Sequence, residues 1–271
     1  MVNENSICNP LRKDVKRSGW VNRISTKLIL KKLKKTPRYT PNFIKIEGLN
    51  LSYPDSASFV SMYKSIFVKK MYSFRSDKES PLIIDCGANI GLSVIFFKQQ
   101  FPSSTILAFE PDPYIFKHLQ HNLHVNRIEG VSLINKAAWI SETTLDFYTE
   151  KADGSRIAME GETNIIKVPA VRLRDFLNRE VDFLKIDIEG AEDKVMPDIA
   201  DSLSHVLNLF VEYHSFSRKE QKLPEILHLI KAKGFRIHIL PEIVSDRPFC
   251  EVKEYAKMDM QLNIFCWREE L

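Results

Sequence analysis

Three ionisable side chains stand where two apolar strands are expected to end. Asp187 closes the run VDFLKID, and Glu212 and His214 lie in the run LNLFVEYH. The ends of adjacent parallel strands meet at one edge of a sheet, so we expect these side chains to converge. A histidine has the intrinsic pKa to take a proton from a hydroxyl near neutral pH. The cluster therefore predicts a catalytic site in which a histidine could act as a base.

The same residues permit two other interpretations. Asp187 and Glu212 could hold Mg²⁺ through oxygen ligands, which would make the site a metal centre. Glu212 and His214 could also do no more than hydrogen-bond the loop behind them. Ionisable clusters at strand ends of such sheets usually lie in the pocket, which favours a functional site. Base and metal both stay open, with a slight preference for the base.

A second group of residues has the pattern of a cofactor-binding turn. The stretch IIDCGANIG ends a hydrophobic strand in Asp85 and opens the next helix with Gly87 and Gly91. Glu110 follows Gly91 by nineteen residues, at the end of the next strand, where a carboxylate can accept hydrogen bonds from a ribose. A dinucleotide site would need glycine in place of Asn89, so that pyrophosphate can approach the backbone. S-adenosylmethionine has no phosphate, so the turn favours S-adenosylmethionine over NAD.

The elements that must position these residues alternate between strand and helix from residue 81 onward. The runs PLIID, STILAFEPD, VSLINKAAW, VDFLKID and LNLFVEYH predict strands, and ANIGLSVIFFKQQF and PYIFKHLQHNLHVN predict helices between them. The last two runs, FRIHIL and QLNIFCW, have no predicted helix between them and indicate an antiparallel hairpin. We therefore predict an α/β, Rossmann-like fold with a doubly wound, mostly parallel sheet and a C-terminal antiparallel hairpin.

The chain divides into three segments by composition. Residues 1–40 carry eleven Lys and Arg against two acidic residues, a net charge of +9, which leaves −5 for the rest because the whole chain carries +4. They predict a basic helical arm that either packs on the body or contacts an anionic membrane surface. Residues 41–80 predict a strand pair and an amphipathic helix that form a cap, with acceptor binding as a candidate role. Residues 81–271 would bind the cofactor.

Overall composition predicts a soluble intracellular protein. With 271 residues, 44% of them hydrophobic, the chain can bury a full core. Its four cysteines are scattered without a CxxC pair, which is typical of reduced thiols. The N-terminus lacks the apolar core of a signal peptide, and no apolar run reaches the ~18 residues of a membrane span. We expect a cytoplasmic location, with peripheral contact at the inner face of the membrane as the alternative.

Four stretches together resemble the FkbM-type methyltransferases. They are IIDCGANIG, FEPDP, FLKIDIEGAE and VEYH, in this order and spacing, and the resemblance covers roughly residues 60–240. It implies a class I methyltransferase fold with S-adenosylmethionine as cofactor. It also implies O-methylation of a hydroxyl on a sugar, glycolipid or natural-product acceptor.

The resemblance further implies where individual residues lie around the cofactor. Those bordering its methionine part would be Asp85, Gly87, Asn89 and Gly91. Those near the ribose would be Glu110, with Pro111 and Asp112 beside it, and those near the adenine would be Asn135 and Ala137. Asp187 would belong to both the cofactor site and the catalytic cluster.

Two rival functions have less support. A nucleic-acid methyltransferase acting on base amino groups would be expected to carry an NPPY or DPPY signature at the fourth strand, where DIEG stands instead. An acidic mouth would also repel phosphates, so no nucleic-acid partner is expected. A non-catalytic module would have no reason to keep Asp85, Glu110, Asp187 and His214 together.

Overall fold

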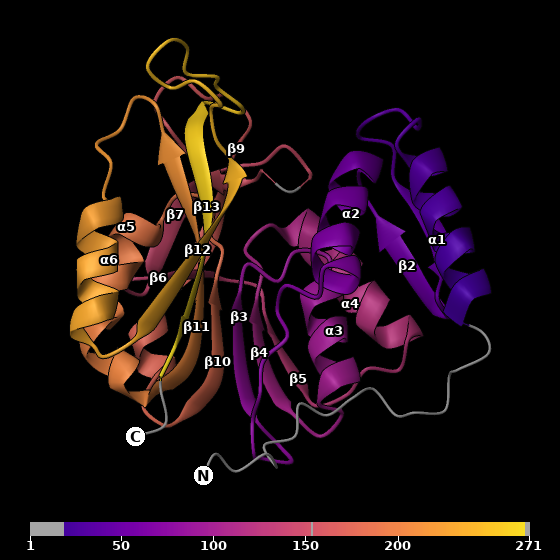
Figure 1. Ribbon diagram of the computed structural model, residues 1–271, viewed down its shortest axis with the longest axis horizontal. Helices are drawn as coiled ribbons and strands as arrows, with labels where there is room; N and C mark the ends of the chain where they lie inside the picture. Colours follow the sequence, from indigo (N-terminus) through magenta and orange to yellow (C-terminus); the bar gives the residue numbers. More distant parts are fainter. Residues whose placement is uncertain (1–18, 153, 269–271) are drawn as a thin grey trace.

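We describe residues 19–152 and 154–268 of the protein from a computed structural model. A seven-stranded sheet forms the centre of this structure (Figure 1). The strand order is β12-β13-β11-β10-β3-β4-β5, and among these strands β13 runs antiparallel to both its neighbours while the other pairs are parallel. The strands are β3 (Leu82–Cys86), β4 (Thr105–Phe109), β5 (Val131–Ile134), β10 (Val181–Ile186), β11 (Val206–Phe216), β12 (Arg236–Ile243) and β13 (Met258–Trp267). The doubly wound sheet and its C-terminal antiparallel hairpin are thus confirmed.

Helices cover both faces of this sheet. α3 (Leu92–Gln100) and α4 (Pro113–Val125) lie on one face, and α5 (Glu192–Ile199) and α6 (Leu223–Ala232) lie on the other (Figure 1). Successive strand residues point to opposite faces, so Ile83 joins the core under α3 and Ile84 joins the core under α5. Burial on both faces explains why these strands are almost continuously apolar.

The predicted strand VSLINKAAW is two strands in two sheets, which corrects the sequence-based prediction. β5 ends at Ile134, and β6 (Ala137–Trp139) joins a second sheet of order β6-β9-β7-β8. The other strands of that sheet are β7 (Thr143–Tyr148), β8 (Arg156–Ile157) and β9 (Ile165–Arg172). The break falls at Asn135, whose Nδ2 donates to the carbonyl oxygens of Glu110 and Pro111 at 2.8 and 3.1 Å. That contact turns the chain out of the central sheet.

The helix predicted from residue 88 begins later than expected, at Leu92. Asn89 and Gly91 both have positive φ values, +47° and +88°, which a right-handed helix does not contain. The residues before Leu92 therefore form an open loop at the carboxyl end of β3. This places bare backbone, rather than a helical turn, beside the cavity described below.

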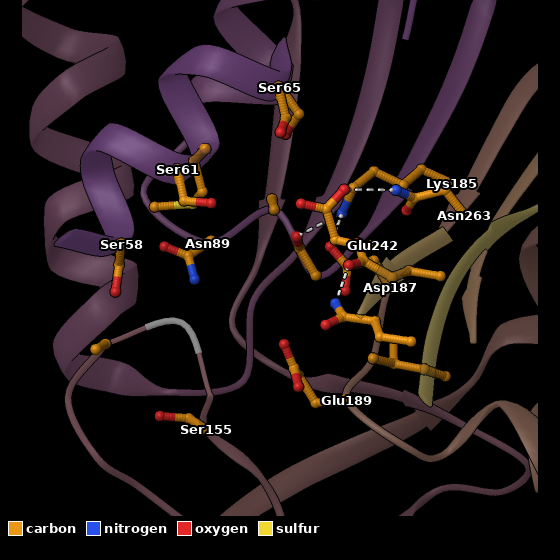
Figure 2. A pocket seen from close by; sticks show the side chains of 18 of the residues that line it. Ser58, Ser61, Ser65, Asn89, Ser155, Lys185, Asp187, Glu189, Glu242 and Asn263 are labelled. Atoms are coloured by element: carbon orange, nitrogen blue, oxygen red, sulfur yellow. Dashed lines mark hydrogen bonds and ion pairs between the residues drawn. The ribbon is translucent and has the colours of Figure 1, made fainter. Parts of the chain in front are cut away.

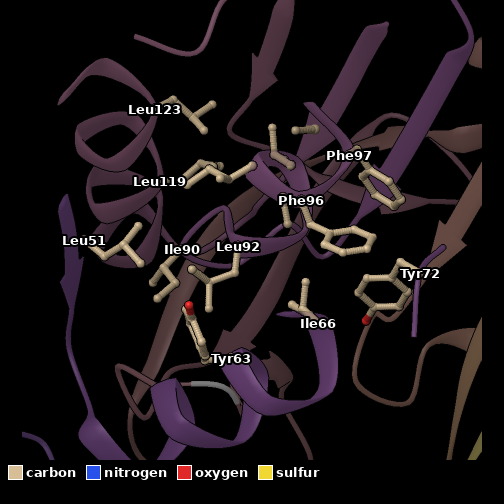
Figure 3. Close-up of a cluster of buried hydrophobic side chains, with 14 of the residues drawn as sticks. Leu51, Tyr63, Ile66, Tyr72, Ile90, Leu92, Phe96, Phe97, Leu119 and Leu123 are labelled. Carbon is tan, nitrogen blue, oxygen red and sulfur yellow. The ribbon is translucent and has the colours of Figure 1, made fainter. Parts of the chain in front are cut away.

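The N-terminal segment packs against the α3 and α4 side of the sheet (Figure 1). β1 (Asn42–Ile46) and β2 (Leu49–Tyr53) form a hairpin, and α2 (Ser56–Tyr63) follows and continues as a single stretch of π-helix, η1 (Lys64–Val68). Figure 3 shows Tyr63 and Ile66 of this segment among the buried side chains of α3, such as Leu92 and Phe96. The apolar side of α2 is thus fixed to the core, which leaves its other side to face the cavity.

Helix α1 (Gly19–Leu33) lies against the hairpin and α2 (Figure 1). Leu30 is buried, and the Thr26 hydroxyl donates to Glu47 at 2.9 Å. The described part of the basic arm therefore packs on the body, one of the two alternatives predicted for it, and residues 1–18 of the arm lie outside the described residues. Among the described helices, none is both long and apolar enough to cross a membrane.

Candidate active site

A cavity of about 720 Å³ opens at the carboxyl edge of the central sheet. Figure 2 shows its two walls: Ser58, Ser61, Ser65 and Asn89 on one side, and Lys185, Asp187, Glu189, Glu242 and Asn263 on the other. The first wall comes from α2, η1 and the loop after β3, and the second comes from β10, the loop after it, and the C-terminal hairpin. This edge is where parallel α/β sheets bind their ligands.

The loop after β3 is held by close packing of its backbone. A Cβ atom on Gly87 would lie 1.9 Å from the carbonyl oxygen of Asp187, so no other residue fits between these two loops. Gly91 has a φ of +88° and packs on Leu119 of α4. Gly87 and Asn89 line the cavity, whereas Gly91 does not. The glycine spacing therefore reflects loop packing as well as access for a ligand.

Glu110 lies at the end of β4 with its carboxylate held in the cavity wall. Its two oxygens accept backbone N–H bonds from Asn89 at 3.0 Å and from Asp112 at 2.9 Å. Burial raises the pKa of Glu110 to about 8, against the opposing effect of these donors. Each oxygen keeps a second lone pair, so the carboxylate can still accept hydrogen bonds from a ligand.

Of the other residues predicted around the cofactor, Pro111 and Ala137 line the cavity, whereas Asp112 and Asn135 do not. Asp112 caps α4 by accepting from the N–H of Tyr114 at 2.8 Å. Asn135 instead ties the end of β4 to the end of β5. Both residues position the wall without lining it.

Asp85 is also placed differently from the prediction. It is fully buried behind the cavity wall, accepts a hydrogen bond from the Ser93 hydroxyl and lies 3.3 Å from Lys185 Nζ. Lys185 does line the cavity, and its ammonium group also contacts Asp187 Oδ2 at 3.0 Å and the carbonyl oxygen of Gly87 at 2.8 Å. Asp85 therefore acts on the site through Lys185.

Asp187, Glu212 and His214 converge as expected, each offering one ligand atom within 4.8 Å of the others. Asp187 and Glu212 line the cavity. Burial and the neighbouring Asp187 carboxylate raise the pKa of Glu212 to about 8, and Gln261 donates a hydrogen bond to it. Glu212 is therefore a carboxyl group whose proton affinity lies close to physiological pH.

Comparison with known protein families identifies the family of this chain. Residues 85–237 match the family described as the methyltransferase FkbM domain, more than half of the chain. The chain belongs to the FkbM methyltransferase family. The fold is accordingly that of a class I, S-adenosylmethionine-dependent methyltransferase, and the sheet order agrees with it.

Curated relatives of this FkbM-family chain come from fungi and bacteria. Methyltransferase 1 of Beauveria bassiana is 28% identical over 66% of this chain and 81% of its own length. Methyltransferase sdnD of Sordaria araneosa is 28% identical over 73% of this chain and 90% of its own length. The 31-O-demethyl-FK506 methyltransferase FkbM of Streptomyces tacrolimicus is 22% identical over 70% of this chain and 86% of its own length.

His214 does not line the main cavity of this FkbM-family enzyme, although it lies beside Asp187 and Glu212. Its Nδ1 contacts Glu192 at 3.1 Å, and its Nε2 lies 3.5 Å from Glu189. Burial would lower the pKa of His214, but these carboxylates outweigh it and hold the pKa well above its ordinary value. Both ring nitrogens thus face carboxylates in the loop before α5 or at its first residue, which agrees with the alternative that His214 hydrogen-bonds the loop behind it.

The Asp187 and Glu212 pair fits Mg²⁺ poorly. Asp187 is already paired with the Lys185 ammonium group, and Glu212 receives the amide N–H of Gln261. A hard cation needs oxygen ligands that are free of competing donors. The donors present argue for a site whose positive charge comes from Lys185.

Lys185 is the residue that reasoning from sequence missed in this FkbM-family site. The signal was present, because a lysine interrupts the otherwise apolar strand VDFLKI. Its side chain is 2% exposed. A buried lysine must be paired, and here the neighbouring Asp187 and Asp85 overcome the effect of burial and raise its pKa.

Proposed function

We propose that the chain is an O-methyltransferase that transfers the methyl group of S-adenosylmethionine to a hydroxyl of a sugar, glycolipid or natural-product acceptor. The observation that carries the proposal is the position of Glu212, a carboxyl group that lines the cavity beside Asp187 and Lys185, and its raised pKa of about 8 supports the proposal. A hydroxyl is a poor nucleophile until a base takes its proton, and this carboxylate is placed to do so.

The residues of one half of the cavity fit S-adenosylmethionine. The Glu110 carboxylate would hold the ribose hydroxyls, and Gly87 and Asn89 would lie along the methionine part. The adenine would lie between Pro111 and Ala137. Bound there, the cofactor supplies an electrophilic methyl group on a cationic sulfur, and the nearby Asp187 suits a positive charge. Among the described residues on the cofactor side of the cavity, there is no unpaired lysine or arginine that could bind a phosphate.

The chain's own residues would then divide the remaining work. Glu212 accepts the hydroxyl proton, Lys185 pairs with Asp187 and holds it in place, and His214 holds the loop that carries Asp187 through Glu192. Glu192 reaches that loop by accepting the backbone N–H groups of Ile188 and Gly190 at 3.3 and 3.2 Å.

The other half of the cavity is where the acceptor would bind, which gives the cap formed by residues 41–80 its role. Ser58, Ser61 and Ser65 of the cap face the hairpin residues across the cavity (Figure 2). Carboxylates such as Glu189 and Glu242 line the opposite wall, and they would repel nucleic-acid phosphates. A small hydroxylated acceptor fits this charge, and the Streptomyces relative named above is likewise an O-methyltransferase by its name.

The test is methyl transfer with labelled S-adenosylmethionine and separate pools of glycans, glycolipids and nucleic acids. Label is expected in a glycan or glycolipid product as a methyl ether that survives mild base. Label in the nucleic-acid pool alone, or binding of NAD without binding of S-adenosylmethionine, would contradict the proposal.

Glu110→Ala is expected to weaken S-adenosylmethionine binding by about 1–3 kcal/mol, the cost of leaving the ribose hydroxyls without their hydrogen-bond partner in the buried wall. Calorimetry measures it directly. Glu180→Ala is the matched control, because Glu180 is a surface carboxylate that pairs with Lys78 and lies outside the cavity. Equal affinities for the two variants would remove Glu110 from the cofactor site.

Peripheral membrane contact would use the lysine face of α1. The apolar side of the helix is turned to the core at Leu30, whereas Lys27 and Lys31 of the helix, and Lys35 just after its end, are exposed. Contact would therefore be electrostatic rather than by insertion of an apolar helix face. It would bring the enzyme, at the cytoplasmic side, to a lipid-linked acceptor.

Lys31→Glu together with Lys35→Glu is expected to lower sedimentation with anionic liposomes at least tenfold, since each basic residue contributes about 1 kcal/mol near such a surface. The control is Lys167→Glu with Lys194→Glu, which changes net charge equally on β9 and α5. If both pairs sediment alike at low salt, α1 does not contact membranes.

A further inference from the structure

A buried amide oxygen in the cavity wall has no partner within the described part of the chain. Asn263 lies on β13, is 4% exposed and lines the cavity. Its Nδ2 donates to Glu242 Oε2 at 3.3 Å, whereas its Oδ1 receives no hydrogen bond from the described residues. Buried amide oxygens nearly always have a donor. An oxygen left without one on a cavity wall points to a ligand that brings the donor.

The groups around this oxygen are acceptors as well. Glu242, Glu212 and Asp187 present carboxylates to the same wall, which Figure 2 shows for Glu242 and Asp187. The donors nearby are already engaged, because Lys185 contacts Asp187 and the Asn263 amide N–H contacts Glu242. A ligand at this wall must therefore supply O–H or N–H donors, and a phosphate or carboxylate is disfavoured there.

The distance between this oxygen and the proposed base is set by sheet geometry. Asn263 and Glu212 are directly paired across the antiparallel strands β13 and β11. Side chains so paired stand about 4.5–5.5 Å apart at Cβ, so one small molecule can reach both. A ligand whose reacting hydroxyl meets Glu212 would place its neighbouring substituent at Asn263.

We propose that Asn263 and Glu242 form an acceptor subsite that binds a hydroxyl or ammonium group on the carbon next to the hydroxyl that is methylated. The inference rests on the O-methyltransferase function proposed above and narrows its substrate to vicinal diols and amino alcohols. Ser61 and Ser65 on the facing wall can donate or accept, so they complement the far side of such a polyol. A phosphate next to the reacting hydroxyl is excluded by charge.

The experiment measures transfer of labelled methyl groups to a panel of methyl glycosides. The panel includes their monodeoxy, amino-deoxy and monophosphate derivatives. The wild-type chain is compared with Asn263→Leu, which keeps the size and removes the oxygen, and with Asn263→Asp, which keeps an oxygen acceptor. Asn164→Leu, at an exposed position outside the cavity, is the control. Calorimetry with S-adenosylmethionine checks that each variant is folded and binds cofactor.

Asn263→Leu is expected to lower kcat/KM by 10- to 100-fold on the diol probes, with the Kd for S-adenosylmethionine unchanged. On deoxy probes that lack the neighbouring hydroxyl, the wild type and Asn263→Leu should converge, and Asn263→Asp should retain activity on amino alcohols. Equal kcat/KM for wild type and Asn263→Leu on diols, or full activity on the phosphates, would overturn the subsite alone. A wild type that binds S-adenosylmethionine and methylates no hydroxyl probe would refute the proposed function, and the subsite with it.

Discussion

Glu212→Gln is expected to lower the rate of methyl transfer by ~10²–10⁴-fold, the usual contribution of a general base, while S-adenosylmethionine still binds. Glutamine keeps the shape of the side chain and can still accept the hydrogen bond from Gln261, so the wall should stay intact. Only the ability to take a proton is lost. Single-turnover methyl transfer, with calorimetry of cofactor binding beside it, measures the two effects separately.

The pH dependence of the wild type should identify the same group. Burial and Asp187 raise the pKa of Glu212 to about 8, so the carboxyl is largely protonated and inactive as a base below that pH. The rate should therefore rise as pH increases through the region around 8, and the positive sulfonium of bound cofactor should move this rise to lower pH. Glu212→Gln should give a flat profile over the same range.

Three outcomes would contradict the assignment of the base. One is a Glu212→Gln variant with the wild-type rate, and another is a rise with pH that persists in that variant. The third is activity that EDTA abolishes and Mg²⁺ restores, which would return Asp187 and Glu212 to the role of metal ligands. His214→Ala serves as a comparison, because a residue that only positions the loop should lower the rate without removing the rise with pH.

Lys185→Met is expected to lower the free energy of unfolding by about 3–5 kcal/mol, the cost of leaving buried charges without their partner. The substitution keeps most of the side-chain volume but leaves Asp85 and Asp187 facing each other without a cation. Both contacts are short, at 3.3 and 3.0 Å, and Asp85 is fully buried. Urea unfolding at neutral pH measures the effect.

A double variant separates charge from packing in this prediction. Lys185→Met with Asp85→Asn removes the negative charge that lost its partner, so it should recover part of the stability. Lys194→Met is the control, since Lys194 lies at the surface, and its substitution should change the free energy of unfolding by less than about 0.5 kcal/mol. A Lys185→Met variant as stable as that control would show that the buried charges are not coupled.

Strand order and apolar periodicity made the sheet and part of the site predictable from the sequence. Parallel strands bring their carboxyl ends together, so the meeting of Asp187 with Glu212 could be foreseen: each follows directly on Ile186 and Val211, the last pair of the β10–β11 ladder, although β11 itself continues to Phe216. The apolar runs likewise predicted the sheet, because burial on both faces leaves few other sequences for such strands. Both predictions use only the pattern of apolar and polar residues within short stretches of the sequence.

The remaining features depend on loop conformations that periodicity does not encode. His214 is covered because the loop before α5 turns through Glu189 and Gly190, both at positive φ, and brings Glu192 to it. The second sheet arises because one amide, that of Asn135, bonds the end of β4 and turns the chain. Neither contact leaves a periodic signal in the sequence. The apolar pattern therefore predicted His214 in the cavity, and it predicted one strand over residues 131–139 where the structure has β5 and β6.

The absent side chain of Gly87 has a consequence for how the protein can diverge. Since a single added carbon would meet the Asp187 carbonyl at 1.9 Å, the loop of the cofactor half and the loop of the catalytic half are fitted to each other and can change only together. Both loops fall inside the family match at residues 85–237, whereas α2 and β13 fall outside it. Mutations can therefore alter the walls assigned to the acceptor, one residue at a time, without disturbing the contact at Gly87. Descendants of this protein can therefore keep the same methyl-transfer chemistry while the acceptor molecule changes.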